Sequence, residues 1–177
     1  MIYLKKILTE GKTPKYGCLM AYIGGEYKNK ILNFNKELID NNIIYDNKQG
    51  EFGRELNPHI TIKFGFTKAY TRNEIGNMLD NIIPFKISLK KTSIFETDAF
   101  DVVKMDANGE ILKKLNKKFS KLPNEDEHPI YHPHCTLAYV KKGEGINFKN
   151  KGNDMSNIII DELVYSYDGS KYHYILK

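Results

Sequence analysis

A four-residue pattern that occurs twice constrains the fold of this 177-residue chain more than any other feature. The copies are Pro58-His59-Ile60-Thr61 and Pro133-His134-Cys135-Thr136, and an aliphatic residue follows each of them. The recurrence indicates an internal duplication of one structural unit. Because alternate residues of a strand face the same way, we expect each His and Thr pair to share one face of a strand. Two imidazoles and two hydroxyls would then be available to one cleft.

Apolar periodicity divides the rest of the chain into alternating strands and helices. An apolar run at 17–23 and the motif segments at 60–66 and 135–140 predict strands, and 85–96 with 100–105 predict a hairpin. Helical spacing predicts helices at 26–42, 71–83 and 110–122, the second of which opens on a capping box from Thr71 to Glu74. Residues 141–157 predict a loop, and 158–167 with 172–176 predict a closing hairpin. This order indicates an α/β or α+β fold with helices on the outer faces of sheets.

The duplicated residue types suit phosphodiester chemistry. Cleavage beside a ribose hydroxyl needs a base for the nucleophile and an acid for the leaving oxygen, and two imidazoles supply both. Two threonine hydroxyls can donate to the non-bridging phosphate oxygens as negative charge builds up. The sequence leaves open which histidine is the base, and whether the ribose 2′-hydroxyl or a water molecule attacks.

Composition favours an anionic substrate and a reducing compartment. The formal net charge is +5, and such a basic excess attracts nucleotides or RNA through long-range steering. A lysine cluster at 113–121 has near-helical spacing, and a solvated helix face explains it more simply than a nucleic-acid patch does. Cys18 and Cys135 fall inside predicted strands, as small buried residues of a reduced protein do. The chain shows neither a secretory signal nor an apolar run of membrane-spanning length, so we expect a cytoplasmic protein that does not bind membranes.

A metal site is the main alternative to metal-free chemistry. His128, His132 and His134 lie within seven residues, a density that is compatible with zinc. No CxxC pair or HExxH motif accompanies them, and His134 already belongs to the duplicated pattern. We therefore expect no metal and no cofactor.

The paired strands and their spacing resemble the 2H phosphoesterase superfamily, which includes bacterial RNA 2′,3′-cyclic phosphodiesterases of the LigT type. The resemblance implies an α+β fold with two pseudo-symmetric antiparallel sheets that form a central cleft, within a single domain spanning residues 1–177 and motif strands at 59–66 and 134–140. It also implies that His59, Thr61, His134 and Thr136 are catalytic. The segment 53–65 is most similar to phage-type members, among them the anti-CBASS nucleases that destroy cyclic oligonucleotide immune signals.

Substrate-binding residues are less visible, and three are candidates. Arg54 could reach a phosphate as a bidentate donor, and Tyr16 could stack on a base. Counting alternate residues from Thr61 places Lys63 toward the cleft, as a phosphate contact, and Phe64 toward the core. A tyrosine-rich group near the closing hairpin is a further candidate rim of the site: Tyr165, Tyr167, Lys171 and Tyr172.

The same counting in the second motif strand places Ala138 toward the cleft and Tyr139 toward the core. It starts from Thr136 and assumes regular alternation along the strand.

The sequence thus predicts a monomeric, metal-independent phosphodiesterase whose first candidate substrate is a cyclic oligonucleotide. The alternative within the enzyme class is an RNA-end enzyme that opens 2′,3′-cyclic phosphates or cuts 2′-5′ linkages. An alternative of another class is a non-catalytic nucleotide-binding module. If a phage encodes the chain, its location would be the host cytoplasm.

Overall fold

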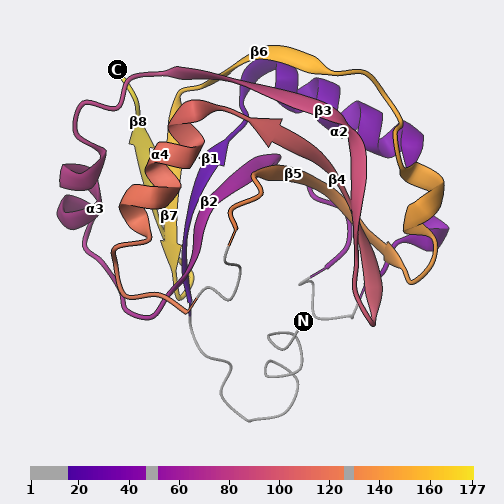
Figure 1. Cartoon of the computed structure of the whole chain (residues 1–177), viewed down its shortest axis with the longest axis horizontal. Helices are drawn as coiled ribbons and strands as arrows, with labels where there is room; N and C mark the ends of the chain where they lie inside the picture. The colour runs from indigo at the N-terminus through magenta and orange to yellow at the C-terminus, as the bar shows by residue number, and fades with distance from the viewer. Residues whose placement is uncertain (1–15, 47–51, 126–129) are drawn as a thin grey trace.

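The strands form one antiparallel sheet that curls into an arch (Figure 1). The computed structural model describes residues 16–46, 52–125 and 130–177. Among these residues the sheet has eight strands in the order β6-β3-β4-β5-β2-β1-β7-β8. The strands are β1 (Gly17–Tyr22), β2 (His59–Phe66), β3 (Phe85–Glu96), β4 (Phe100–Asn108), β5 (His134–Lys141), β6 (Met155–Ile160), β7 (Glu162–Tyr167) and β8 (Ser170–Ile175).

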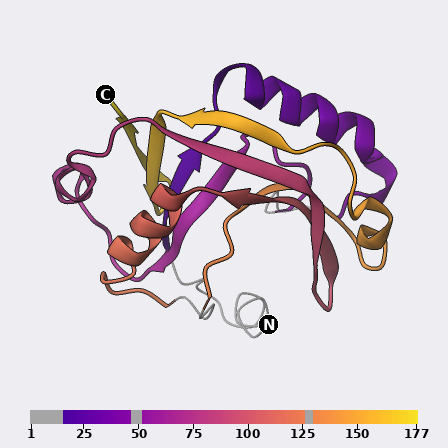
Figure 2. The same ribbon diagram turned by 45° about the horizontal axis from the view of Figure 1, so that its top comes forward.

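Three α-helices and two short 3₁₀ helices complete the described structure. They are α2 (Gly25–Leu38), α3 (Arg72–Leu79), α4 (Glu110–Phe119), η1 (Asn41–Ile43) and η2 (Gly145–Phe148). Helices α2 and α4 lie on the outer side of the arch, and the turned view shows α2 running beside β6 (Figures 1 and 2). The fold is therefore the expected α+β arrangement with helices outside the sheet. No helix in the described part of the chain is long and apolar enough to cross a bilayer.

The two motif strands meet at the centre of the sheet, where its two four-stranded halves join. In the described residues β2 and β5 are paired at one position, Ile60 with Cys135, and beyond it the strands diverge. The predicted pair of sheets is thus one continuous sheet with a weakly joined middle. The diverging edges are covered crosswise. The segment before β2 bonds to β5 through Glu55 N and Leu137 O (2.8 Å), and the segment before β5 bonds to β2 through Glu125 N and Gly65 O (2.8 Å).

The duplication extends to an irregularity in both motif strands. The register of β2 against β1 shifts just after Thr61, so that Met20 pairs with Thr61 but Leu19 pairs with Lys63. The register of β5 against β4 shifts at the same place after Thr136, where Val103 pairs with Ala138. Each shift inserts one extra residue, as in a β-bulge, and reverses the alternation that follows it.

Each bulge is held by an asparagine from a helix of the other half. The Nδ2 group of Asn35 on α2 donates to the carbonyl of Leu137 at 2.7 Å. The Nδ2 group of Asn116 on α4 donates to the carbonyl of Ile62 at 2.7 Å. Both carbonyls belong to the bulge residue that follows a motif threonine, so the two helices stabilise equivalent backbone positions.

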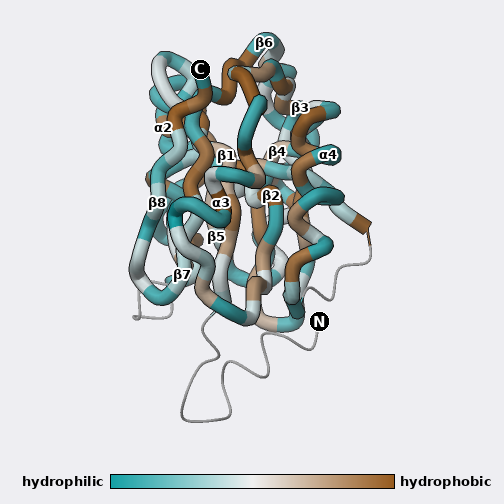
Figure 3. Tube along the Cα trace, turned by 90° about the vertical axis from the view of Figure 1, so that its left-hand side faces the viewer, coloured by the Kyte–Doolittle hydropathy of each residue, from teal (hydrophilic) through white to brown (hydrophobic). Residues whose placement is uncertain are grey.

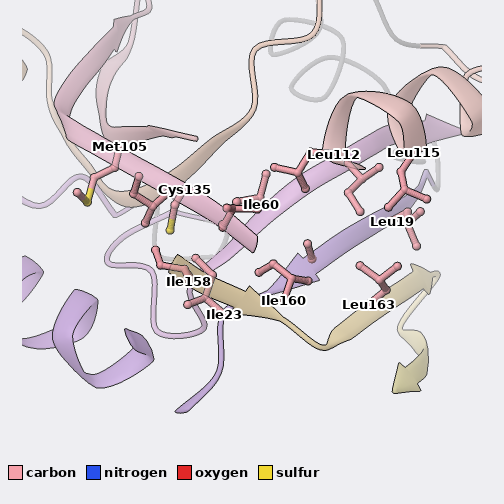
Figure 4. Packing of buried hydrophobic residues seen from close by; sticks show 14 of the residues in the cluster. Leu19, Ile23, Ile60, Met105, Leu112, Leu115, Cys135, Ile158, Ile160 and Leu163 are labelled. Carbon is pink, nitrogen blue, oxygen red and sulfur yellow. The ribbon is translucent and has the colours of Figure 1, made fainter. Parts of the chain in front are cut away.

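The core lies between the helices and the outer face of the sheet. Hydrophobic segments concentrate along the central strands and the turns around them are mostly hydrophilic (Figure 3). Figure 4 shows Leu112 and Leu115 of α4 facing Leu19 of β1, with Ile60 and Cys135 in the same cluster. All five side chains are essentially inaccessible to solvent. Apolar burial of this kind supplies most of the driving force for folding.

Most predicted elements are confirmed, with shorter helices and a different C-terminal end. Helix α3 opens on the predicted capping box at Thr71 but ends at Leu79, and α4 ends at Phe119. The single strand expected at 158–167 is wrong, because the chain crosses from one half of the sheet to the other near Asp161. Strand β6 pairs with β3, whereas β7 pairs with β1. The expected loop at 141–157 also contains η2 and the start of β6.

Candidate active site

The four motif side chains lie together on the concave face at the centre of the sheet. Antiparallel pairing of Ile60 with Cys135 sets His59 across from Thr136 and Thr61 across from His134. Ile60 and Cys135 point into the core, so the residues on either side of them point to the opposite face, where all four are partly exposed. Diagonal neighbours in such a ladder have Cα atoms roughly 7–8 Å apart. This spacing leaves room for one phosphate between the two imidazoles.

Both histidines are held in the same way. The Nδ1 atom of His59 lies 2.9 Å from the carbonyl of Asn57, and the Nδ1 atom of His134 lies 2.8 Å from the carbonyl of His132. A carbonyl can only accept, so Nδ1 carries the proton in each ring. The Nε2 atom of each imidazole is therefore the nitrogen left without the proton. In each motif the proline lies between the residue whose carbonyl accepts this bond and the histidine. The restricted φ angle of Pro58 and Pro133 therefore limits the backbone conformations available there.

The two imidazoles have different surroundings. Burial lowers the pKa of His134, the charge of Lys104 lowers it further, and the carbonyl of His132 and the carboxylate of Asp106 oppose the change. His59 is more open, with a side chain 23% exposed, and Glu55 Oε2 lies 3.8 Å from its Nδ1 atom. A neutral imidazole is thus favoured at His134, while a carboxylate lies near the ring of His59.

A buried lysine beside the second motif was not identified from the sequence. Lys104 of β4 pairs with Thr136 in the ladder and is 3% exposed. Its ammonium group donates to Ser93 Oγ (2.8 Å) and forms a short ion pair with Asp106. Burial raises the pKa of Asp106, but the hydrogen bond and charge of Lys104 outweigh it and keep that pKa below the usual value. A charged residue inside the run Val102-Val103-Lys104-Met105 was the available sequence signal.

Thr61 and Thr136 have unequal neighbours. The Thr61 side chain hydrogen-bonds the thiol of Cys18, whose pKa burial raises to about 12, and the Tyr131 hydroxyl donates to the Thr61 carbonyl at 2.9 Å. A thiol with so high a pKa stays protonated and is no nucleophile at neutral pH. Thr136 instead has the Lys104 ammonium in the neighbouring strand. Negative charge on a bound phosphate would therefore be stabilised mainly near Thr136.

An aromatic ring lies beside each motif imidazole. The ring of Tyr22 is 5.9 Å from that of His59, and the ring of Phe95 is 5.0 Å from that of His134 in an edge-to-face contact. Phe95 is 38% exposed, with the Lys104 ammonium over its other side at 4.0 Å from the ring centroid. Rings in this position can stack on the bases that flank a phosphate. Sequence reasoning missed both residues, since neither lies within a motif.

Arg54 is bonded to the end of α2, and its role as a phosphate ligand stays a prediction that these bonds do not favour. Its guanidinium donates to the carbonyls of Asn35 and Ile39, both at 2.6 Å, and to the side-chain oxygens of Asn35 (2.6 Å) and Asn41 (2.9 Å). These oxygens lie at the C-terminal end of α2, where helix carbonyls lack intrahelical partners. Arg54 thereby orients the Asn35 amide that supports Leu137. The sequence could not show this, because the partners come together only in the folded chain.

The bulges reverse the predicted facing of the residues after each threonine. Phe64, expected in the core, is 42% exposed, and Lys63 is only 6% exposed and pairs with Leu19. In the second strand Ala138 is fully buried while Tyr139 is partly exposed. Alternation was counted correctly, but an inserted residue moves every later side chain to the other face. Lys63 therefore does not present an open cation to the cleft.

Tyr16 lies beside Phe64 and not beside a motif histidine. Its ring is 5.8 Å from that of Phe64, and its hydroxyl donates to Glu125 Oε2 at 2.6 Å. Its role in base stacking stays a prediction. Of the histidines considered for zinc, His128 lies outside the described residues, and the carbonyl of His132 orients His134. Within residues 16–46, 52–125 and 130–177, no group of three or more His, Cys, Asp or Glu side chains could hold a metal ion.

A curled antiparallel sheet with two HxT strands at its centre defines a 2H phosphoesterase. Residues 45–148, more than half of the chain, match the model of the 2′-5′ RNA ligase superfamily. The chain therefore belongs to this superfamily and is a hydrolase of the 2H phosphoesterase type. It matches no curated protein.

Solved structures share the fold at low sequence identity. Escherichia coli LigT complexed with 3′-AMP is 14% identical, with a TM-score of 0.63 over 93% of this chain and 96% of that chain. Kluyveromyces marxianus Usb1 is 10% identical, with a TM-score of 0.58 over 91% and 98% of the two chains. The TT0787 protein of Thermus thermophilus is 12% identical, with a TM-score of 0.54 over 92% and 95%. These similarities extend over nearly all of the chain.

Proposed function

We propose that the chain is a metal-independent phosphodiesterase that cleaves a phosphodiester of a nucleotide substrate by two-histidine acid–base catalysis. The observation that carries this proposal is the crosswise arrangement of His59, Thr61, His134 and Thr136 around the Ile60–Cys135 pair. An acid, a base and two hydroxyl donors then surround one point on a two-fold axis. A binding module needs phosphate donors but no matched pair of imidazoles with free Nε2 atoms.

We propose roles for the two imidazoles from their unequal surroundings. His134, whose pKa burial lowers, is the general base, because its Nε2 atom has a free lone pair near neutral pH. It removes the proton from the attacking oxygen, which is either the ribose 2′-hydroxyl or a water molecule. His59, beside Glu55, is the general acid, and its Nε2–H protonates the leaving oxygen as the phosphorus–oxygen bond breaks. Each proton transfer contributes about 10²–10⁴-fold to the rate.

Charge stabilisation comes from the hydroxyls and from Lys104. Thr61 and Thr136 donate to the two non-bridging oxygens, on which negative charge increases in the transition state. Lys104, one strand away from Thr136, adds a positive potential, and its own burial reduces the screening of that charge by water. Tyr22 and Phe95 then supply one ring on each side for the flanking bases.

Our first choice of substrate is a cyclic oligonucleotide of the kind that anti-CBASS nucleases destroy. It rests on the similarity of segment 53–65 to phage-type members, and the two-ring arrangement fits a compact substrate with bases on both sides of the phosphate. The alternative is an RNA end carrying a 2′,3′-cyclic phosphate or a 2′-5′ linkage. LigT and Usb1 structures with 3′-AMP and uridine monophosphate support nucleotide recognition in general. The proposed enzyme acts as a monomer in the cytoplasm.

Turnover of a substrate panel in EDTA tests this proposal. The panel contains cyclic dinucleotides, a cyclic trinucleotide, a 2′-5′ oligoadenylate and an RNA ending in a 2′,3′-cyclic phosphate. We expect cleavage of the cyclic oligonucleotides that is lost in His59→Ala and His134→Ala and kept in Lys90→Gln, which changes a surface residue paired with Asp154. Cleavage of the linear RNAs alone would establish the alternative. Tight binding of nucleotides with no cleavage of any panel member would refute an enzyme.

A further inference from the structure

Tyr131 lies in the short segment before β5 and reaches across to β2. Its hydroxyl donates to the carbonyl of Thr61 at 2.9 Å, although the two residues are 70 positions apart in the sequence. The ring is half-buried and packs against the hydrophobic core. Burial raises the pKa of the hydroxyl, so the group stays protonated and acts as a donor near neutral pH. The proposed acid–base chemistry makes no use of this bond.

The bond from Tyr131 falls on the backbone of the first bulge. The register of β2 against β1 shifts just after Thr61, so the Thr61 carbonyl lies where the irregular stretch begins. The next carbonyl along the chain, that of Ile62, accepts a bond from Asn116 of α4 at 2.7 Å. Two successive carbonyls of β2 are therefore held by side chains that come from two other segments. Because a bulge sets the direction of the side chains around it, these bonds also fix the direction of Thr61.

The segment that carries Tyr131 also holds the imidazole across from Thr61. His132 follows Tyr131 directly, and its carbonyl lies 2.8 Å from the Nδ1 atom of His134. The pairing of the motif strands sets Thr61 across from His134. Residues 131–134 thus orient one motif imidazole and one motif threonine that belong to different halves of the sheet.

The other motif threonine lacks this support in the part of the chain that the structure describes. Leu56 stands three residues before the first motif histidine, as Tyr131 does before the second, and its side chain is 64% exposed and has no donor. The carbonyl of Thr136 is approached by the Cys135 thiol at 3.7 Å, and a thiol is a weak donor. Tyr131 therefore departs from the internal symmetry and acts on Thr61 alone.

We propose that Tyr131 is a positioning residue that directs the Thr61 hydroxyl toward the phosphate and holds it at a fixed distance from His134. It acts through Thr61, since its one donor hydrogen is engaged by the backbone carbonyl. A displacement of about 1 Å in an active site can lower a rate by about 10²-fold. Loss of this one bond should therefore lower kcat by about tenfold and leave KM nearly unchanged. The inference rests on the proposed phosphodiesterase function.

Steady-state kinetics of Tyr131→Phe on the same substrate panel in EDTA test this role. Phenylalanine keeps the ring and removes the donor, so we expect the tenfold lower kcat with an unchanged KM. The matched control is Tyr27→Phe, which removes a hydroxyl that donates to Ser156 O, also at 2.9 Å, and should leave both constants unchanged. An amino group can donate from the same place, so 4-aminophenylalanine at position 131 should restore kcat.

A double-mutant cycle separates the positioning of Thr61 from a general loss of structure. In a chain that already carries Thr61→Val, Tyr131→Phe should have no further effect on kcat, because the hydroxyl that it directs is gone. In a chain that carries Thr136→Val, the same substitution should still lower kcat by about tenfold. Equal losses in the two backgrounds would overturn the proposal, since a structural defect would act in both.

Two further results separate this inference from the proposed function. Turnover by the unmodified chain with an unchanged kcat in Tyr131→Phe would overturn the role of Tyr131 and leave the phosphodiesterase intact. An unmodified chain that cleaves no panel member would refute the phosphodiesterase, and this role with it. Should Tyr131→Phe fail to fold, 4-fluorophenylalanine at position 131 makes the same test, because fluorine fills the place of the hydroxyl and cannot donate.

Discussion

The side-chain amide of Asn35 donates a hydrogen bond of 2.7 Å to the carbonyl of Leu137, a residue 102 positions away in the sequence. Asn116 makes the same bond to Ile62. Each asparagine thus supports the bulge that follows a motif threonine. Because a bulge changes the direction of the side chains around it, these bonds connect helix packing to the direction of the Thr61 and Thr136 hydroxyls.

Replacing Asn116 by Leu should therefore affect both stability and catalysis. The Ile62 carbonyl would lose its side-chain donor, and we expect the free energy of unfolding to fall by about 1–3 kcal/mol. We also expect a lower kcat with little change in KM, because the orientation of the Thr61 hydroxyl matters most in the transition state. Urea unfolding and steady-state kinetics measure the two effects. The control is Asn147→Leu, which removes an exposed amide from η2, and an equal loss of kcat in both variants would contradict a role for the bulge.

The two threonine hydroxyls should contribute to kcat separately. Thr136→Val and Thr61→Val keep the side-chain shape and remove the donor, and we expect a loss of about 10²–10³-fold for a fully used donor. Thr136 should lie nearer the upper limit because Lys104 is adjacent to it, whereas Thr61 also hydrogen-bonds the Cys18 thiol. Single-turnover kinetics would show the difference. Thr67→Val, with an exposed side chain, should leave the rate unchanged, and full activity in either motif variant would exclude that hydroxyl from the mechanism.

The pH dependence of kcat/KM should report the environment of His134. A general base is active when neutral, and burial lowers the pKa of His134. Activity should therefore rise with pH through a limb that lies below the usual value for histidine.

Lys104→Gln should move this limb to higher pH. It removes a charge that lowers the pKa of His134 and leaves Asp106, which raises it. Lys90→Gln is the control, since Lys90 pairs with Asp154 on the surface. A pH profile that Lys104→Gln leaves unmoved would argue against His134 as the base.

Arg54 should matter for stability and not for substrate affinity. Arg54→Ala removes four hydrogen bonds at the end of α2, and we expect a loss of about 2–3 kcal/mol in the free energy of unfolding, as for bonds to a charged group. KM should remain that of the unmodified enzyme when measured well below the melting temperature. The opposite pattern, a raised KM with unchanged unfolding, would restore Arg54 as a phosphate ligand.

The sequence predicted those parts of the site that depend on local patterns. His59, Thr61, His134 and Thr136 were found because a tetrad recurs, and the capping box at Thr71 because its bonds span three residues. The sequence predicted the wrong sheet face for Lys63 and Tyr139. A bulge arises from the pairing of two strands, and it has no fixed signature in the sequence of either strand.

Lys104 and Arg54 show the same limit. One is a buried cation beside a motif and the other an expected ligand that stabilises a helix. Each role is defined by partners that are distant in sequence, so only the folded chain reveals it.

The crosswise support of the motif strands bears on the origin of the fold. The segment before β2 covers β5, the segment before β5 covers β2, and the asparagines of α2 and α4 reach across in the same way. An ancestor of half the size, folding alone, would have had a motif strand with an unpaired edge and a bulge without a side-chain donor. Two copies would have completed each other around a two-fold axis, the symmetry of an isologous dimer. Joining those copies in one chain freed their surroundings to diverge, so that two identical histidines now lie in different environments.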